Sequence, residues 1–128
     1  MPLYRVLSRP DLLTPAQRTE FSHDVLEVHC GATGAPPSFV HVLYQDAGPD
    51  ALDGVEARIA STIRAGRNGD QKQQISSSLR ARLARLADIP PESIATDVAD
   101  IQASYTMEGG ELLPEPGSEE EKNWGAGS

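Results

Sequence analysis

Two stretches of equal length decide the fold of this 128-residue chain: TPAQRTEFSHDVLEVHCGATGAPP at residues 14–37 and NGDQKQQISSSLRARLARLADIPP at residues 68–91. They align without a gap at an offset of 54 residues, because the proline pair that begins at Pro36 matches the pair that begins at Pro90 (90 − 36 = 54). The chain therefore contains an internal duplication.

Each stretch has apolar residues at helical spacing, in steps of three and four. These positions are Phe21, Val25, Val28 and Ala32 in the first copy and Ile75, Leu79, Leu83 and Leu86 in the second. Thr14, before Pro15, and Asn68 are suitable caps for the start of a helix. A pair of prolines cannot continue a helix. We therefore predict one helix in each copy, ending before the proline pair.

The segments on either side of each helix have the composition of strands. They cover residues 3–7, 39–44, 57–63 and 93–98. The predicted strands and helices therefore form two consecutive βαβ units. We expect an α/β (α+β) fold with a four-stranded sheet and two helices on one face. A sheet of this size with one bare face normally pairs with copies of itself, so we expect an oligomer.

Composition excludes several classes of protein. The net charge is −8, and no apolar run approaches the ~20 residues that span a bilayer. We expect no signal peptide, and the single Cys30 cannot form an internal disulfide, which fits a cytoplasmic protein. An acidic chain is a poor partner for nucleic acid. We therefore expect neither a nucleic acid nor a membrane as partner.

The charge is unevenly distributed. Residues 1–107 carry 10 basic and 13 acidic residues, whereas residues 108–128 carry six Glu and one Lys. We therefore divide the chain into a duplicated domain, 1–107, and an acidic tail, 108–128. Gly, Pro and Glu in the tail disfavour packed structure, but the Leu112–Leu113 pair and Trp124 favour a tail that docks near the site.

Pro2 is the first candidate for chemistry. Methionine is usually trimmed before a small second residue, and its removal would leave a secondary amine at the start of a strand. A free α-amino group has a pKa near ~7.7–8.0, which burial or nearby cations lower toward neutrality. Such an amine can act as a general acid or base. A proline at this position is also commonplace in proteins without any such role.

Four further residues, two arginines, a histidine and a glutamate, are candidates for binding or chemistry. Arg64 and Arg67 lie between the third strand and the second helix, where two guanidinium groups can clamp a carboxylate, or can simply be solvated. His29 stands where the second copy has Leu83, so it is either a satisfied core residue or a site residue. Glu119, in an acidic run, could activate water or only add charge. The histidine spacing shows no metal site, so we expect no metal and no cofactor.

Together these residues resemble the tautomerase superfamily, and most closely its branch of cis-3-chloroacrylic acid dehalogenase and relatives. The resemblance spans nearly the whole chain. It rests on Pro2, on residues 13–15 (LTP), 28–34 (VHCGATG), 64–67 (RAGR) and 112–119 (LLPEPGSE), and on Trp124. The ordered set carries the resemblance, since no one of these motifs is specific.

The resemblance implies a homotrimer with sites near subunit interfaces, in which Pro2 is the acid and base. Arg64, Arg67 and His29 would hold the substrate carboxylate, and Glu119 would correspond to the residue that activates water. The chain departs from the family pattern at one place. The dehalogenase has a tyrosine where a gapless alignment puts Gly109, and Tyr105 is the nearby tyrosine that a shift would bring there.

Three functions remain open. The first is a cofactor-independent tautomerase for 2-hydroxy-2-enoate or pyruvate-type acids, with Pro2 and Arg67 central. The second is a hydratase or dehalogenase of short unsaturated acids that uses Glu119. The third is a non-catalytic trimeric binding protein, which a retained Met1 would favour because the nitrogen of Pro2 would then be an amide. We therefore expect the partners to be a small carboxylate and further copies of this chain.

Overall fold

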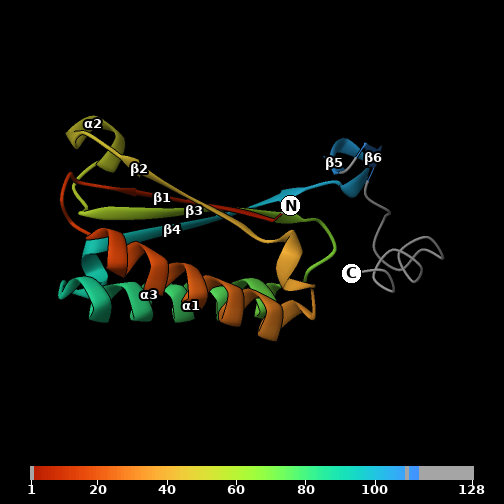
Figure 1. The fold of residues 1–128 in the computed structure, drawn as a ribbon, viewed down its shortest axis with the longest axis horizontal. Helices are drawn as coiled ribbons and strands as arrows, with labels where there is room; N and C mark the ends of the chain where they lie inside the picture. The colour runs from red at the N-terminus through yellow and green to blue at the C-terminus, as the bar shows by residue number, and fades with distance from the viewer. Residues whose placement is uncertain (1, 109, 113–128) are drawn as a thin grey trace.

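The computed structural model describes residues 2–108 and 110–112, which build a four-stranded sheet with two long helices against one face (Figure 1). The strands of this sheet are β1 (Leu3–Ser8), β2 (His41–Asp46), β3 (Ala57–Arg64) and β4 (Ile94–Ile101). The helices are α1 (Pro15–Thr33) and α3 (Gly69–Ala87). The predicted fold class is confirmed, and each predicted strand overlaps an observed one.

The order of strands shows how the duplication is built. The sheet reads β2-β1-β3-β4, with β1 parallel to β2 and β3 parallel to β4. Each parallel pair is connected through a long helix, so each copy is one βαβ unit. The two units meet at the centre of the sheet, where β1 pairs antiparallel with β3 and Leu3 lies opposite Thr62.

Both helices begin at a capping box that also links the two copies. The predicted caps, Thr14 and Asn68, each accept a hydrogen bond from the backbone three residues ahead. In each helix, the side chain of the third residue also forms a hydrogen bond with the C-terminal end of the other helix. The side chain of Gln17 donates to the carbonyl of Leu86 at 3.2 Å, and that of Gln71 donates to the carbonyl of Ala32 at 3.1 Å. The duplication is thus repeated in the contacts between α1 and α3.

The helices end as the proline pairs require. α1 is capped at its C-terminus by Gly34, whose φ of 75° lies in the left-handed region that favours glycine. α3 is capped by Asp88, which is also left-handed. Each proline pair then opens a short 3-10 turn, η1 (Pro37–Phe39) in the first copy and η2 (Pro91–Ser93) in the second.

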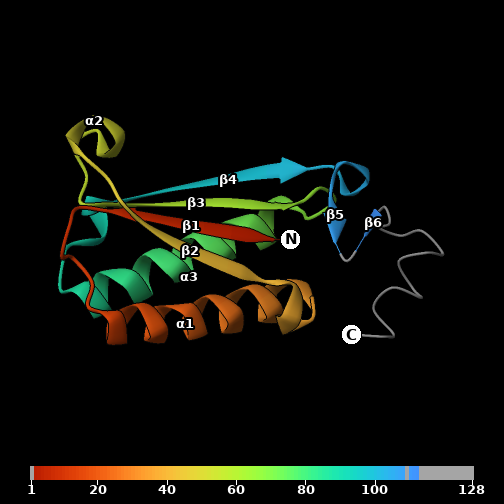
Figure 2. The ribbon, with the colours of Figure 1, turned by 45° about the horizontal axis from the view of Figure 1, so that its top comes forward.

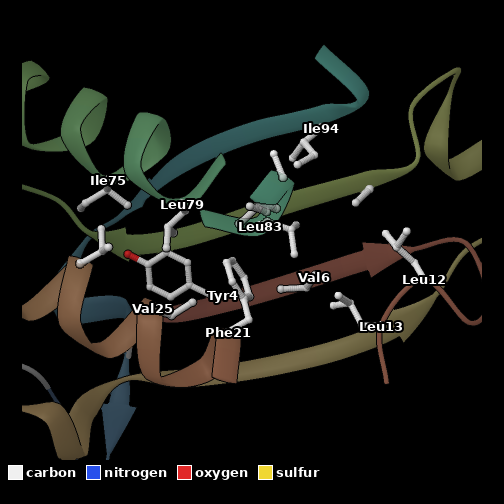
Figure 3. Packing of buried hydrophobic residues seen from close by; sticks show 14 of the residues in the cluster. Tyr4, Val6, Leu12, Leu13, Phe21, Val25, Ile75, Leu79, Leu83 and Ile94 are labelled. Atoms are coloured by element: carbon white, nitrogen blue, oxygen red, sulfur yellow. The ribbon is translucent and has the colours of Figure 1, made fainter. Parts of the chain in front are cut away.

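The core lies between the sheet and the two helices (Figure 3). Along β3 the side chains alternate, so that Ala57, Ile59, Ser61 and Ile63 are buried and the residues between them are not. The predicted helical stripes enter this core, with Phe21, Val25, Ile75 and Leu79 at 1% exposure or less. Of the described helices, only the short one between β2 and β3 lies on the other side of the sheet, at one end of the strands (Figure 2).

Two features were not predicted. A four-residue helix, α2 (Pro49–Leu52), precedes β3, and a hairpin of β5 (Met107–Glu108) and β6 (Glu111–Leu112) follows β4 after the turn η3 (Ala103–Tyr105). The boundary that we placed at residue 108 lies inside this hairpin. The rest of the acidic tail, with Trp124, lies outside the described residues. Within the described part of the chain, no helix is long and apolar enough to cross a membrane.

Candidate active site

Pro2 lies at the amino end of β1, at the centre of the sheet. It is buried, and its carbonyl accepts a hydrogen bond from the backbone of His41 at 3.0 Å. The antiparallel register with β3 continues from the Leu3–Thr62 pair to place Pro2 opposite Ile63. Because side chains alternate along a strand, Pro2 shares the helix-facing side of the sheet with Tyr4. The first candidate is therefore anchored to β2 by one backbone hydrogen bond and faces the same side as the core.

His29 lies in the last turns of α1, which run back beside the start of β1 (Figure 1). Its side chain is 2% exposed, and its Nδ1 lies 2.5 Å from the hydroxyl of Tyr4. The two rings meet edge to face, with centroids 5.5 Å apart. His29 is thus buried with a polar partner, and this arrangement is compatible with both a structural and a site role.

The electrostatic surroundings of His29 favour the neutral imidazole. Burial, followed by the positive charges of Arg67 and of the chain's amino terminus, lowers the pKa of His29 from 6.5 to about 4. The charge of Arg67 thus acts on the pKa of His29, a coupling that the sequence could not show. The structure therefore brings together His29, Arg67 and the amino end of β1.

A tight turn carries the two arginines. β3 ends at Arg64, and α3 begins at Gly69 behind its cap. Gly66 between them has a φ of 108°, a conformation that residues with a side chain rarely adopt. The backbone of Ala65 donates to the carbonyl of Ile101 at 2.8 Å, so the turn is held against the end of β4. Arg67 is consequently fixed at the mouth of the second helix.

The two arginines are positioned by different parts of the backbone. Ile63 points into the core, so alternation along β3 directs Arg64 to the open face. Arg67 lies beyond the end of this strand, in the turn before α3, and its charge lowers the pKa of His29. A ligand held by both guanidinium groups must therefore lie at the end of the sheet, where the two faces meet.

Of the other two predicted site residues, one lies in the hairpin region and one lies beyond the described chain. Tyr105 lies in η3 after β4, and its side chain is 80% exposed. Glu119 lies outside the described residues.

Tyr4 is the residue that the sequence analysis missed as a possible part of the site. It is fully buried and forms the hydrogen bond to His29, although we treated it only as a strand residue. One signal was available, because a tyrosine two residues after Pro2 must share its face of the strand. The identity of its partner depends on how α1 packs, which no local pattern reveals.

A cavity elsewhere in the molecule is lined by other residues than those of the candidate active site. One of about 580 Å³ is lined by residues that include Arg9, Pro10, Leu52 and Val55. These residues follow β1 or flank α2, at the opposite end of the sheet from Pro2 (Figure 2). Its lining contains neither a histidine nor Arg64 or Arg67, so it is separate from the candidate active site.

Comparison with known proteins identifies the family. The family described as "Putative oxalocrotonate tautomerase enzyme" matches residues 1–128, and the chain therefore belongs to this tautomerase family. No curated protein matches the chain. The resemblance seen in the sequence is thereby confirmed at the level of the family.

Three solved structures illustrate the relationship. N1, a member of the cis-3-chloroacrylic acid dehalogenase family, is 29% identical with a TM-score of 0.83, and the match covers 95% of this chain and 89% of that one. A fused 4-OT wild-type asymmetric trimer shares the fold at 18% identity and a TM-score of 0.75, with 86% and 94% covered. Macrophage migration inhibitory factor of Toxoplasma gondii does so at 21% identity and 0.73, with 87% and 99% covered.

Proposed function

We propose that this protein is a cofactor-independent tautomerase in which Pro2, exposed by removal of Met1, transfers a proton within a 2-hydroxy-2-enoate or pyruvate-type acid. The observation that carries the proposal is the meeting of a buried neutral His29, the cation Arg67 and the amino end of β1. Membership of a tautomerase family supports it.

The reaction needs only positioning and one titrating amine. Arg64 and Arg67 hold the carboxylate of the enol at the end of the sheet, and His29 donates a hydrogen bond to one of its oxygens. The amine of Pro2 takes the proton from the 2-hydroxyl group and returns it to carbon. The O–H bond and the C=C bond are lost, while a C–H bond and a C=O bond form. A neighbouring cation such as Arg67 lowers the pKa of the amine toward the working pH.

The test is ketonisation of phenylenolpyruvate, followed by ultraviolet absorbance, in the wild type and in Pro2→Ala. Intact mass first establishes that both proteins lack Met1. We expect the catalysed rate in Pro2→Ala to fall at least a hundredfold, which corresponds to the loss of a general acid or base. Pro10→Ala, at the other end of the sheet, is the matched control and keeps the wild-type rate. Ketonisation that survives Pro2→Ala undiminished would contradict the proposal.

A homotrimer is part of the same proposal. Neither α1 nor α3 covers the opposite face of the sheet (Figure 1), and a fused 4-OT of the same fold is an asymmetric trimer. Tyr105, exposed beyond the end of β4, would then contact substrate near a subunit boundary. Light scattering on the eluted protein is expected to give three times the 13.7 kDa chain mass. A monomer would remove the basis for placing Tyr105 at a shared site.

A second function has its own support, because N1, at 29% identity, is a member of the cis-3-chloroacrylic acid dehalogenase family. We propose hydration or hydrolytic dehalogenation of a short unsaturated acid as the alternative, with Glu119 directing water and Pro2 protonating the adjacent carbon. Chloride release from cis-3-chloroacrylate measures it. The activity is expected to fall in Glu119→Gln and to persist in Glu121→Gln, its neighbour in the acidic run. Full activity in Glu119→Gln would exclude that role.

A further inference from the structure

Tyr4 and His29 form a buried polar pair in a largely apolar core. Tyr4 is fully buried on β1 and His29 is 2% exposed on α1, and 25 residues separate them in the sequence. Figure 3 shows the ring of Tyr4 among aliphatic side chains that include Val25 and Leu79. The contact joins the hydroxyl oxygen to Nδ1 at 2.5 Å, which is short for a hydrogen bond between oxygen and nitrogen.

The direction of this hydrogen bond follows from the needs of Tyr4. Burial, and then the nearby Cys30, raise the pKa of the Tyr4 hydroxyl, so it keeps its proton at any ordinary pH. A buried O–H group without an acceptor costs about 1–3 kcal/mol. Among the described residues, the structure gives this hydroxyl one hydrogen-bond partner, the Nδ1 atom of His29. The O–H group therefore donates, and Nδ1 accepts.

The groups around His29 favour the same protonation state. Arg67 from the turn before α3 and the amino terminus both contribute positive charge, and each opposes a second proton on the ring. Tyr4 on β1 and Cys30 on its own helix are neutral groups whose pKa values burial raises. An imidazole that accepts at Nδ1 and stays neutral carries its one proton on Nε2.

We infer that Tyr4 is a positioning residue that holds His29 as the neutral tautomer protonated on Nε2, so that His29 offers the active site a hydrogen-bond donor. The role of His29 toward substrate rests on the proposed function, but its tautomer does not. A fixed donor beside Arg67 selects a ligand with an acceptor oxygen, namely a carboxylate or an α-keto oxygen. It disfavours a ligand that presents an N–H or O–H group at that point.

Histidine ring nitrogens can be observed directly in ¹⁵N-labelled protein without substrate, by long-range proton–nitrogen correlation. The chain has three histidines, and exposed His23 and His41 serve as internal controls. We expect His29 to show a bare Nδ1 and a protonated Nε2 from pH 8 down to pH 5. A proton on Nδ1 of His29 in the wild type would overturn the inference.

Tyr4→Phe removes only the hydroxyl group. We expect the His29 ring to lose its single tautomer and its pKa to rise by roughly one unit, because the bond that favoured the neutral form is gone. Tyr44→Phe is the matched control, since the Tyr44 hydroxyl bonds the Arg18 carbonyl at 2.7 Å instead. Unchanged His29 signals in Tyr4→Phe would show that Tyr4 is only a core residue.

Kinetics provide a second readout in an active enzyme. We expect kcat/KM for ketonisation to fall about tenfold in Tyr4→Phe and not in Tyr44→Phe, as the loss of one well-aligned hydrogen bond implies. An unchanged kcat/KM in an active enzyme would contradict a positioning role. Because the nitrogen signals need no substrate, a protein that shows the expected tautomer and no ketonisation contradicts the proposed function and leaves the tautomer assignment supported.

Discussion

The two βαβ units have the same architecture and opposite chemical character at one position. Both have a capped helix of the same length, a cross-link from a glutamine and a proline pair after the helix. At one pair of equivalent positions, however, the two helices differ. The first has His29, bonded to Tyr4, and the second has the fully buried Leu83. The comparison teaches that a duplicated scaffold can keep one copy for packing while the other acquires polar groups that need partners.

The sharpest test of this difference makes the second unit resemble the first. Leu83→His replaces a fully buried leucine of the apolar core with an imidazole, so it loses apolar contact and leaves polar atoms unpaired. We expect the free energy of unfolding to fall by about 3–5 kcal/mol. Urea unfolding at a fixed protein concentration measures it. A loss below about 1 kcal/mol would mean that the second unit accommodates a histidine as readily as the first.

Lowering the pH tests whether His29, in the first unit, is held neutral in the folded protein. The pKa of His29 is about 4 in the folded chain against an ordinary 6.5, so between these values the unfolded chain binds more protons. The contribution of His29 to stability is therefore complete above pH 6.5 and is lost as pH falls toward and below 4. The 2.5-unit difference corresponds to roughly 3 kcal/mol.

The measurement compares urea unfolding at pH 7 and pH 4.5 in the wild type and in Tyr4→Phe/His29→Leu. We expect the wild type to lose more stability than the double variant. Glu27, whose pKa Arg82 lowers through a side-chain hydrogen bond and its charge, is present in both proteins and cancels in the comparison. Equal losses in the two proteins would contradict a depressed pKa for His29.

A double-mutant cycle makes the first unit resemble the second. His29→Leu alone leaves the Tyr4 hydroxyl buried without its acceptor, which we expect to cost about 1–3 kcal/mol. Adding Tyr4→Phe removes both polar partners and should restore most of that loss. Urea unfolding of the wild type, the two single variants and the double variant gives the coupling free energy. Strict additivity would show that the hydrogen bond contributes nothing to stability.

The smallest expected effect concerns what the two units share. Gln17→Ala and Gln71→Ala each remove one half of a capping box and one bond to the other helix. We expect each to lower the free energy of unfolding by about 1 kcal/mol, with similar values for both. Gln74→Ala, at an exposed position of α3, is the control and should change little. Clearly different losses for Gln17→Ala and Gln71→Ala would show that the two equivalent contacts do not contribute equally to stability.

Much of the fold was predictable because its signals are local. The apolar spacing of Phe21 and Val25 indicates a helix, and Thr14 and Asn68 mark helix starts through bonds to residues three positions away. The hairpin after β4 was missed because its strands are two residues each and its Gly and Glu content is typical of loops. Short elements of this kind depend on their surroundings more than on propensity.

Less of the candidate site was predictable. His29 could be recognised as unusual because its counterpart is Leu83, but its partner could not be named. Arg64 and Arg67 looked like one clamp, whereas alternation along β3 directs Arg64 to the open face of the sheet and Arg67 lies beyond the turn at Gly66. Whether both side chains reach one ligand depends on the conformation of this turn and of the end of the sheet, which the spacing of two arginines in the sequence does not define.

The sequence by itself determined the duplication, the two capped helices and the four strands, because periodicity, caps and proline breaks act over a few residues. Only the tertiary structure decided that Tyr4 meets His29, that Gln17 reaches Leu86, and that Arg67 lowers the pKa of the histidine. These contacts span 25 residues or more. They exist because strand pairing and helix packing fix where distant segments meet, and a local pattern carries no information about that register.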